Sequence, residues 1–173
     1  ADKMDFQGVT LPVRMESLSM PLRKIAYAMV GWKGELDGPD YARFKDTHFG
    51  LLGATGRQIM IDVSERFLKP TYGIEVMAKL LLERNEGFYG VLLIRDCGFQ
   101  IEIDQIVRAV GAGNLFMVQV HRPGKGFFND SREWVSHDKF MRVDNNSDMF
   151  ALRTEAGRIY GRLVNQMGWR SEE

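Results

Sequence analysis

The 173-residue sequence has few of the features that mark secreted, membrane or nucleic-acid-binding proteins. It contains a single cysteine, Cys97, which excludes an internal disulfide and is typical of a reducing compartment. No apolar run approaches the roughly 18–20 residues that span a bilayer, and the N-terminus has no signal-peptide pattern. Lysine plus arginine and aspartate plus glutamate both number 23, so no net charge attracts nucleic acid. These absences predict a cytoplasmic protein without a membrane or nucleic-acid partner.

The sequence also lacks the spacing of a metal site. Its histidines, His48, His121 and His137, are far apart in the chain, and Cys97 stands alone. Zinc sites in proteins use closely spaced pairs of such ligands. We therefore expect no structural zinc and no Cys–His nucleophile.

What the sequence does contain is an alternation of strand and helix patterns. The predicted strands are Pro12–Ser19, Val91–Ile94, Leu115–Val120 and Phe140–Val143. The predicted helices begin at Pro21, after Thr55 (ending before Pro70), near Gly73 (to Glu86), at Gln100 (to Val110) and at Asp148 (to Met167). Strands separated by helices predict an α/β fold with a parallel sheet in three layers, formed by a single domain over residues 1–173.

Two stretches are predicted to be loops. Residues 31–50 are rich in glycine, aspartate and aromatic residues, and we expect an irregular excursion there. Residues 122–138 form a polar loop that resembles a lid, which would close on phosphate through Lys125 and Arg132. The same loop has a second interpretation, in which its aromatic side chains face a protein partner. These aromatic residues are Phe127, Phe128 and Trp134.

The segment Val91–Asp104, "VLLIRDCGFQIEID", carries the clearest site pattern. A buried strand there would deliver Asp96 to the mouth of an α/β sheet, where ligands bind. Asp96 has an alternative role as a helix cap or as the partner of an arginine. Glu102 lies on the first turns of the next helix, where the helix dipole favours a carboxylate whatever its function.

Several segments together resemble a known family. They are "SLSMPLRKIAYAMVGW" (Ser17–Trp32), "GRQIMIDVSERFLKPTYGIEVMAK" (Gly56–Lys79), "LLIRDCGFQIEIDQIVRAVGA" (Leu92–Ala112), "VQVHRPG" (Val118–Gly124) and "DNNSDMFAL" (Asp144–Leu152). In this order they are similar to the motifs of the deoxynucleoside monophosphate kinases of phages. The resemblance implies a P-loop nucleotide-kinase-like fold and the transfer of a phosphoryl group from ATP, with Mg²⁺, to a dNMP.

The resemblance also implies a set of binding residues. The substrate-binding candidates are Arg23, Arg57, Asp96 and Glu102. The candidates for the donor nucleotide or the lid are Arg122, Lys125 and Arg132. It assigns no catalytic residue and no protein ligand for a metal.

The sequence departs from the family at the residues that matter most for phosphoryl transfer. It contains no G-x-x-x-x-G-K loop, whose backbone N–H groups cradle phosphates. Other family positions are also changed, at Met20, Ile61, Ser64, Met77 and Gly98. Two hypotheses follow. The chain is a kinase whose phosphate loop lies upstream of Ala1, or it is an inactive relative reused as a structural, assembly or regulatory phage protein, which could reside in the virion.

The family's first strand has no counterpart in this sequence either. That strand would lie between the strands matched by Val91–Ile94 and Leu115–Val120, and its loss would leave unpaired backbone groups. Three solutions are open: residues upstream of Ala1, a strand from a partner or a second copy of the chain, or direct pairing of the two strands. The chain begins Ala1-Asp2-Lys3 without an initiator methionine, which fits truncation, processing or a leftover tag before Met4.

Overall fold

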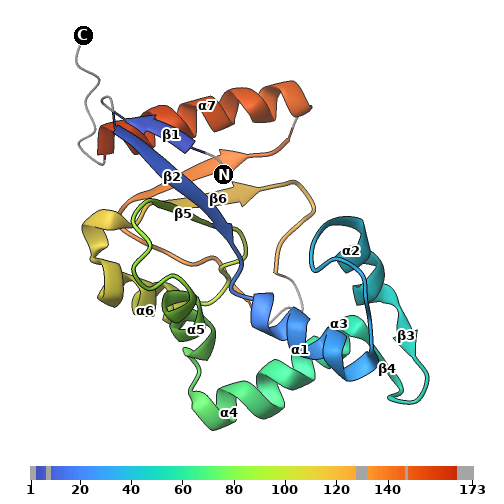
Figure 1. The fold of residues 1–173 in the computed structure, drawn as a ribbon. Helices are drawn as coiled ribbons and strands as arrows, with labels where there is room; N and C mark the ends of the chain where they lie inside the picture. Colours follow the sequence, from blue (N-terminus) through green and yellow to red (C-terminus); the bar gives the residue numbers. More distant parts are fainter. Residues whose placement is uncertain (1–2, 7–8, 128–131, 147, 167–173) are drawn as a thin grey trace. The chain divides into compact units, whose positions relative to one another are not determined.

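The computed structural model describes residues 3–6, 9–127, 132–146 and 148–166 (Figure 1). The described chain is an α/β protein that divides into two compact units. The first unit comprises residues 1–15, 87–93 and 97–173, and the second comprises residues 16–86 and 94–96. The predicted α/β class is confirmed, whereas the single domain over 1–173 stays a prediction.

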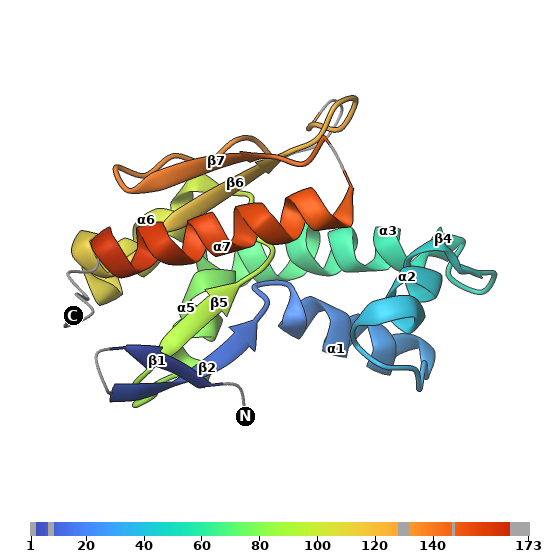
Figure 2. The same ribbon diagram turned by 90° about the horizontal axis from the view of Figure 1, so that it is seen from above.

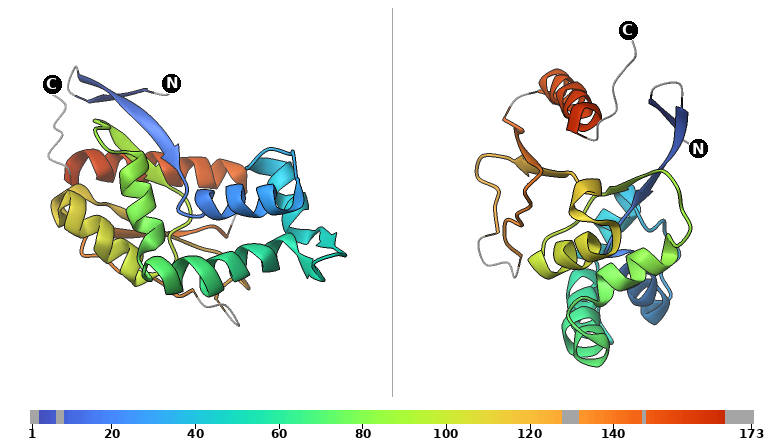
Figure 3. Two further views of the ribbon diagram at one scale, coloured as in Figure 1. Left: turned by 60° about the horizontal axis from the view of Figure 1, so that its bottom comes forward. Right: turned by 90° about the vertical axis from the view of Figure 1, so that its left-hand side faces the viewer.

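The second unit is built mainly from helices. Its elements are α1 (Met20–Val30), α2 (Gly38–Asp46), β3 (His48–Phe49), β4 (Ala54–Thr55), α3 (Gly56–Asp62), the π-helix η1 (Val63–Leu68), α4 (Lys69–Tyr72) and α5 (Val76–Arg84). The strands β3 and β4 form a short antiparallel pair. α3, η1 and α4 follow one another without a break, and α1 lies beside α3 and η1 (Figure 3). The most buried apolar side chains of this unit are Leu18, Ala26, Phe44, Ala78 and Leu81.

Helix α1 begins and ends close to where the sequence predicts. Pro21 occupies the first turn, where its missing N–H costs nothing, and Gly31 ends the helix with a φ of +68°. Helical spacing predicts that one apolar face of this helix is buried, and this prediction is wrong at Met29, which is 57% exposed. The predicted face consists of Leu22, Ile25, Ala26, Met29 and Val30. Tyr27 is buried instead, because its ring packs 4.4 Å from the ring of Phe44 and turns the helix toward α2.

The prediction that residues 31–50 are irregular is wrong for residues 38–46, which form α2. Pro39 stands in the first turn of this helix with its φ already suited to it. Phe44 is fully buried and packs 5.6 Å from the ring of Trp32. Gly56 makes this packing close, because a Cβ atom there would lie 2.2 Å from the carbonyl oxygen of Phe44. The helix is thus supported by tertiary contacts in addition to the local signal at Pro39.

The prediction that the second helix ends before Pro70 is also wrong. The helix continues through η1 and α4 to Tyr72. Pro70 cannot donate a backbone hydrogen bond and would break a plain α-helix. The wider π turns over Val63–Leu68 shift the hydrogen bonding, so that Pro70 falls in the first turn of α4, where an N–H group is not needed.

The first unit contains most of the strands. Its elements are β1 (Lys3–Phe6), β2 (Val9–Glu16), β5 (Val91–Ile94), α6 (Gln100–Val110), the 3₁₀-helix η2 (Ala112–Asn114), β6 (Met117–His121), β7 (Phe140–Asp144) and α7 (Met149–Gln166). β1 pairs antiparallel with β2, and β2 lies next to β5. β6 and β7 form a parallel pair, in register from Met117 opposite Phe140 to His121 opposite Asp144 (Figure 2).

The buried core of the first unit lies between α6 and β6. Ile103, Met117 and Val135 form this cluster, and Val107 and Leu115 pack against it. α6 has the bounds that the sequence predicts, because its apolar residues recur at helical spacing. The same spacing predicts that Val110 faces the core, but this is wrong, since Val110 is 39% exposed.

The strands expected to flank a missing strand are paired in other ways. β5 lies beside β2, and β6 pairs with β7, so the described strands form three small sheets. Direct pairing between β5 and β6 is therefore not the arrangement among the described residues. β5 is also less buried than predicted, since Leu93 is 43% exposed.

Candidate functional site

A polar network lies where β2 and β5 end and α1 begins, within the second unit. The backbone N–H of Arg95 donates to the carbonyl oxygen of Glu16 at 3.2 Å and holds the two strand ends together. The residues that follow each strand therefore meet in one place. We call this group the Arg23–Asp96 network, and its members are Ser17, Ser19, Arg23, Asp37, Arg95 and Asp96.

Asp96 is the carboxylate at the centre of this network. The hydroxyl groups of Ser17 and Ser19 each donate to it at 2.5 Å. The backbone N–H groups of Leu18 and Ser19 donate at 2.7 and 3.1 Å. Burial by itself would raise the pKa of Asp96, but the hydrogen bonds from Ser17, Ser19 and Leu18 outweigh it and hold the pKa below its ordinary value. The carboxylate is therefore ionised at neutral pH.

Arg23 uses all five of its N–H donors. Nε and Nη2 donate to the hydroxyl oxygen of Ser19 at 3.1 and 2.9 Å, and Nη2 also donates to that of Ser17 at 3.0 Å. Nη1 donates to the carbonyl oxygen of Leu36 at 3.0 Å and to the carboxylate of Asp37. With its side chain 7% exposed, Arg23 is held in one orientation.

The guanidinium group of Arg23 has two further neighbours. Its Nη2 lies 3.5 Å from Oδ2 of Asp96, which makes an ion pair between residues far apart in the sequence. Its Cζ lies 4.0 Å from the ring centroid of Tyr41, a residue of α2. The planar group is thus stacked on an aromatic face, an arrangement that lysine could not reproduce as well.

Asp37 and Arg95 form the solvent-exposed side of the network. The carboxylate of Asp37 binds Arg23 through Oδ1 and Nη2 of Arg95 through Oδ2, the latter at 2.9 Å. The side chains of Asp37 and Arg95 are 44% and 42% exposed, against 7% for Arg23. A dissolved ligand would therefore meet the network from the side of Asp37 and Arg95.

A neighbouring ion pair fixes the start of the network. Nη2 of Arg84, on α5, donates to a carboxylate oxygen of Glu16 at 3.2 Å and to the carbonyl oxygen of Ser17 at 3.1 Å. These bonds hold the chain at the end of β2. The serines that bind Asp96 are therefore presented from a fixed backbone.

The structure brings together two of the predicted substrate-binding residues, Arg23 and Asp96. The sequence interpretation missed Ser17, Ser19, Asp37 and Arg95 as members of the same network. One local signal was present, since Arg95 directly precedes Asp96 at a strand end. No local signal marks Asp37, because its link to Arg95 spans 58 residues of sequence.

Arg57, the third candidate, is also in the second unit. It is exposed in the first turn of α3, which begins after the Thr55 hydroxyl accepts a hydrogen bond from the N–H of Gln58 at 3.2 Å. Within the described part of the chain, the Arg57 side chain forms no ion pair and no hydrogen bond. Its role in substrate binding stays a prediction.

Glu102 is the fourth candidate and belongs to the first unit. It is 4% exposed on α6, and the thiol of Cys97 lies 3.8 Å from its Oε2. A carboxylate in the first turn interacts favourably with the helix dipole even when it is exposed. The dipole alone therefore does not explain why Glu102 is buried. Its proposed role in substrate binding stays a prediction.

The loop 122–138 contains an aromatic stack that the sequence interpretation missed in part. The ring of His121, at the end of β6, stacks on Trp134 with centroids 3.8 Å apart and planes at 15°. Phe127 meets the edge of Trp134 at 5.0 Å, and Cζ of Arg132 lies 5.4 Å from the Phe127 ring centroid. Phe127 and Trp134 therefore pack against each other within the loop.

The other two candidates of this loop lie in a tight turn. The N–H of Lys125 donates to the carbonyl oxygen of Arg122 at 3.0 Å, and both side chains are exposed. Residues 128–131, with Phe128, are outside the described residues. Lid closure and contact with a donor nucleotide stay predictions for Arg122, Lys125 and Arg132.

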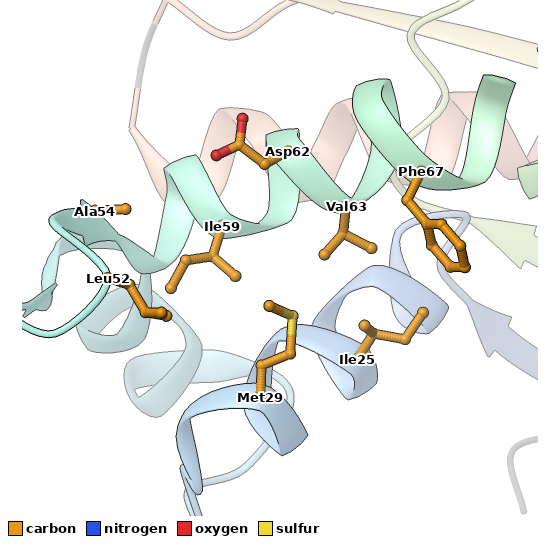
Figure 4. A pocket seen from close by; sticks show the side chains of 8 residues that line it. All are labelled: Ile25, Met29, Leu52, Ala54, Ile59, Asp62, Val63 and Phe67. Atoms are coloured by element: carbon orange, nitrogen blue, oxygen red, sulfur yellow. The ribbon is translucent and has the colours of Figure 1, made fainter.

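A second feature of the helical unit is an apolar groove between α1 and the α3–η1 helix. Figure 4 shows Ile25 and Met29 of α1 pointing toward Ile59 and Val63, with Phe67 at one end. The groove has a volume of about 460 Å³. It offers apolar contact area but few polar groups to fix the orientation of a ligand.

Comparisons with known proteins do not assign the chain to a class. No family model, curated protein or solved structure matches it. Among the described residues, no group of three or more His, Cys, Asp or Glu side chains could hold a metal ion. None of the helices in the described ranges is long and apolar enough to cross a membrane.

Proposed function

We propose that this chain is a deoxynucleoside monophosphate kinase-like phage protein, with a P-loop kinase-like three-layer fold, that holds a dNMP at the Arg23–Asp96 network. One observation carries the proposal. Arg23 and Asp96 belong to two separate segments that resemble the family, and their side chains lie 3.5 Å apart. A chance resemblance gives no reason for residues from the two segments to form one ion pair.

The chemistry of the network supports binding of a nucleotide. Arg23 presents a rigid guanidinium group, which suits the oxygens of a phosphate. Asp96 stays ionised and accepts hydrogen bonds, as a residue facing a sugar hydroxyl or a base amine must do. Because partners fix both groups before the ligand arrives, little conformational entropy is lost on binding.

Phosphoryl transfer makes further demands that these residues do not meet. Catalysis of this reaction is mainly positioning and charge stabilisation around the phosphates of ATP and Mg²⁺. The sequence has no G-x-x-x-x-G-K loop to do this. Transfer of a phosphoryl group from ATP, with Mg²⁺, to a dNMP would need such a loop from outside these 173 residues.

The same observation favours a second candidate function. Without a phosphate loop, the network suits a catalytically inactive relative that binds a nucleotide for a structural, assembly or regulatory role. In that case a protein partner or a second copy of the chain completes the small sheets. The two candidates share the dNMP site and differ in whether phosphoryl transfer occurs.

Calorimetric titration with a panel of dNMPs, the matching deoxynucleosides and ATP–Mg²⁺ tests both candidates. We expect at least one dNMP to bind more tightly than its deoxynucleoside. Asp96→Asn should weaken that binding about tenfold, since a charged hydrogen-bond partner is lost. Asp62→Asn removes the same charge from an exposed ion pair of the same unit and serves as the control.

The outcomes separate the two candidates. Binding of a dNMP together with ADP formation from ATP supports the kinase. Binding without transfer supports the inactive relative. If no dNMP binds the wild-type protein, or if both variants weaken binding equally, the proposed site is wrong.

A further inference from the structure

The exposed side of the Arg23–Asp96 network shows how an anion would enter. Four of the five donors of Arg23 bind oxygens of Ser17, Ser19 and Leu36, which belong to the surrounding fold. The fifth binds Asp37, whose side chain is 44% exposed. Asp37 is therefore the one acceptor of Arg23 among the described residues that solvent can readily replace.

Asp37 also occupies the space between two cations. Its second oxygen accepts a hydrogen bond from Nη2 of Arg95 at 2.9 Å. Within the described part of the chain, this is the only hydrogen bond that the Arg95 side chain makes. One carboxylate thus bridges two guanidinium groups, as a phosphate group commonly does.

The backbone at Asp37 offers its carboxylate a second position. Asp37 is the N-cap residue of α2, with the extended φ of −135° and ψ of 178° that suit a cap, yet its side chain makes no capping hydrogen bond. The N–H of the second residue after a cap position commonly donates this bond, but here that residue is Pro39, which has no N–H. The carboxylate can instead accept from the N–H of Asp40 once it leaves the arginines.

We propose that Arg23 and Arg95 form a phosphomonoester-binding pair whose site Asp37 occupies in the free protein. The phosphate of the ligand displaces the Asp37 carboxylate, which then turns to cap α2. This inference rests on the proposed function, because it names the residues that would bind the phosphate of the dNMP. It adds Arg95 as a binding residue and Asp37 as a displaceable, competing anion.

The proposal makes opposite predictions for the two exposed residues. Asp37→Asn removes the competing charge, so inorganic phosphate and dNMPs should bind about threefold to tenfold more tightly. Arg95→Gln removes a charged donor, so both probes should bind about tenfold to a hundredfold more weakly. If Asp37 merely positioned Arg23 for the ligand, Asp37→Asn would weaken binding instead.

Calorimetric titration of the whole chain with inorganic phosphate and with the dNMP panel measures these changes. Asp62→Asn is the matched control, since it removes a carboxylate from the exposed Asp62–Arg66 ion pair and should leave both affinities unchanged. Circular dichroism of each variant checks that it is folded. Tighter binding to Asp37→Asn with weaker binding to Arg95→Gln supports the proposal.

Other outcomes overturn either this inference or the proposed function. If dNMPs bind but neither variant changes the affinity, the phosphate is not held by this pair. If Asp37→Asn weakens the affinity, Asp37 is not a competing anion. In both cases this inference is wrong, while the proposed function stands. If both variants behave as expected with inorganic phosphate but no dNMP is preferred, the pair exists and the nucleotide assignment is wrong. If no phosphate probe binds even Asp37→Asn, the inference is wrong.

Discussion

The family resemblance implies two arginines of the helical unit as binding residues, and the surroundings of these two arginines in the structure differ. Arg23 is 7% exposed, with five hydrogen bonds and an aromatic ring against its plane. Arg57 is exposed at the start of α3 and has no ion-pair partner in the described residues. A motif match therefore identifies candidates, whereas the surroundings decide whether a side chain is already positioned. Arg23 should contribute to both folding and binding, and Arg57 to binding alone.

The largest expected effect comes from Arg23. Arg23→Met should lower the free energy of unfolding by about 3 kcal/mol, because it removes the donors of five hydrogen bonds and the ion pair with Asp96. Arg57→Met should change it by less than about 0.5 kcal/mol, as for other exposed positions. Urea-induced unfolding followed by circular dichroism measures both values. Equal losses of unfolding free energy in Arg23→Met and Arg57→Met would contradict the conclusion that only Arg23 contributes to folding.

Substitution of Asp96 should have the next largest effect on the free energy of unfolding, and this effect depends on pH. Asp96→Asn should cost about 2 kcal/mol at neutral pH, since the amide cannot accept all four hydrogen bonds. Because the folded-state pKa lies below the ordinary value of 3.8, the ionised carboxylate stabilises the protein above that pH. This stabilisation is lost as the pH falls through the folded-state pKa.

Unfolding measured from pH 7 down to pH 3 tests the dependence. The difference in unfolding free energy between wild type and Asp96→Asn should be constant at the upper end and shrink below pH 3.8. Asp62→Asn, an exposed partner of Arg66, should show a much smaller difference at every pH. A gap that grows toward acid would mean that the pKa of Asp96 is raised rather than lowered.

The helices and strands whose bounds are predicted best are those that a local sequence pattern is sufficient to define. β5 (Val91–Ile94) and α6 (Gln100–Val110) have the predicted bounds. The first is an unbroken apolar run, and the second has apolar residues at helical spacing. By contrast, α2 needs Phe44 to be buried by distant aromatic residues, and the helix through Pro70 needs a π segment. Neither condition can be seen in a short window of sequence.

In the candidate site, too, local sequence identifies some residues, whereas others are identified only by the tertiary structure. Arg23 and Asp96 could be named from the sequence because they lie in segments that resemble the family. Asp37 and Arg95 could not, since their ion pair depends on how α2 is placed against the end of β5. The partners of a motif residue are set by the tertiary structure, and these partners decide its chemistry.

A smaller effect is expected at the helix start that carries Arg57. Thr55→Ala should lower the free energy of unfolding by about 1 kcal/mol, because the hydroxyl that caps α3 is lost. Thr55→Ser keeps the hydroxyl and should cost less. Urea-induced unfolding compares the two variants. If Thr55→Ala is as stable as wild type, the cap does not form in solution, and the orientation of the first turn of α3 is not fixed.

The smallest effect on stability, and the most informative one for the family resemblance, is expected from Arg57→Gln. Removal of the exposed guanidinium group should change the free energy of unfolding by less than about 0.5 kcal/mol. If Arg57 contacts the nucleotide, as the resemblance implies, the dNMP affinity should still fall about tenfold. Arg66→Gln, an exposed arginine of the same helix, is the matched control for charge. An unchanged dNMP affinity in Arg57→Gln would restrict the proposed substrate site to the Arg23–Asp96 network. In that case a resemblance to a motif would not be enough to identify a binding residue, and the side chain would also have to be held in position, as Arg23 is.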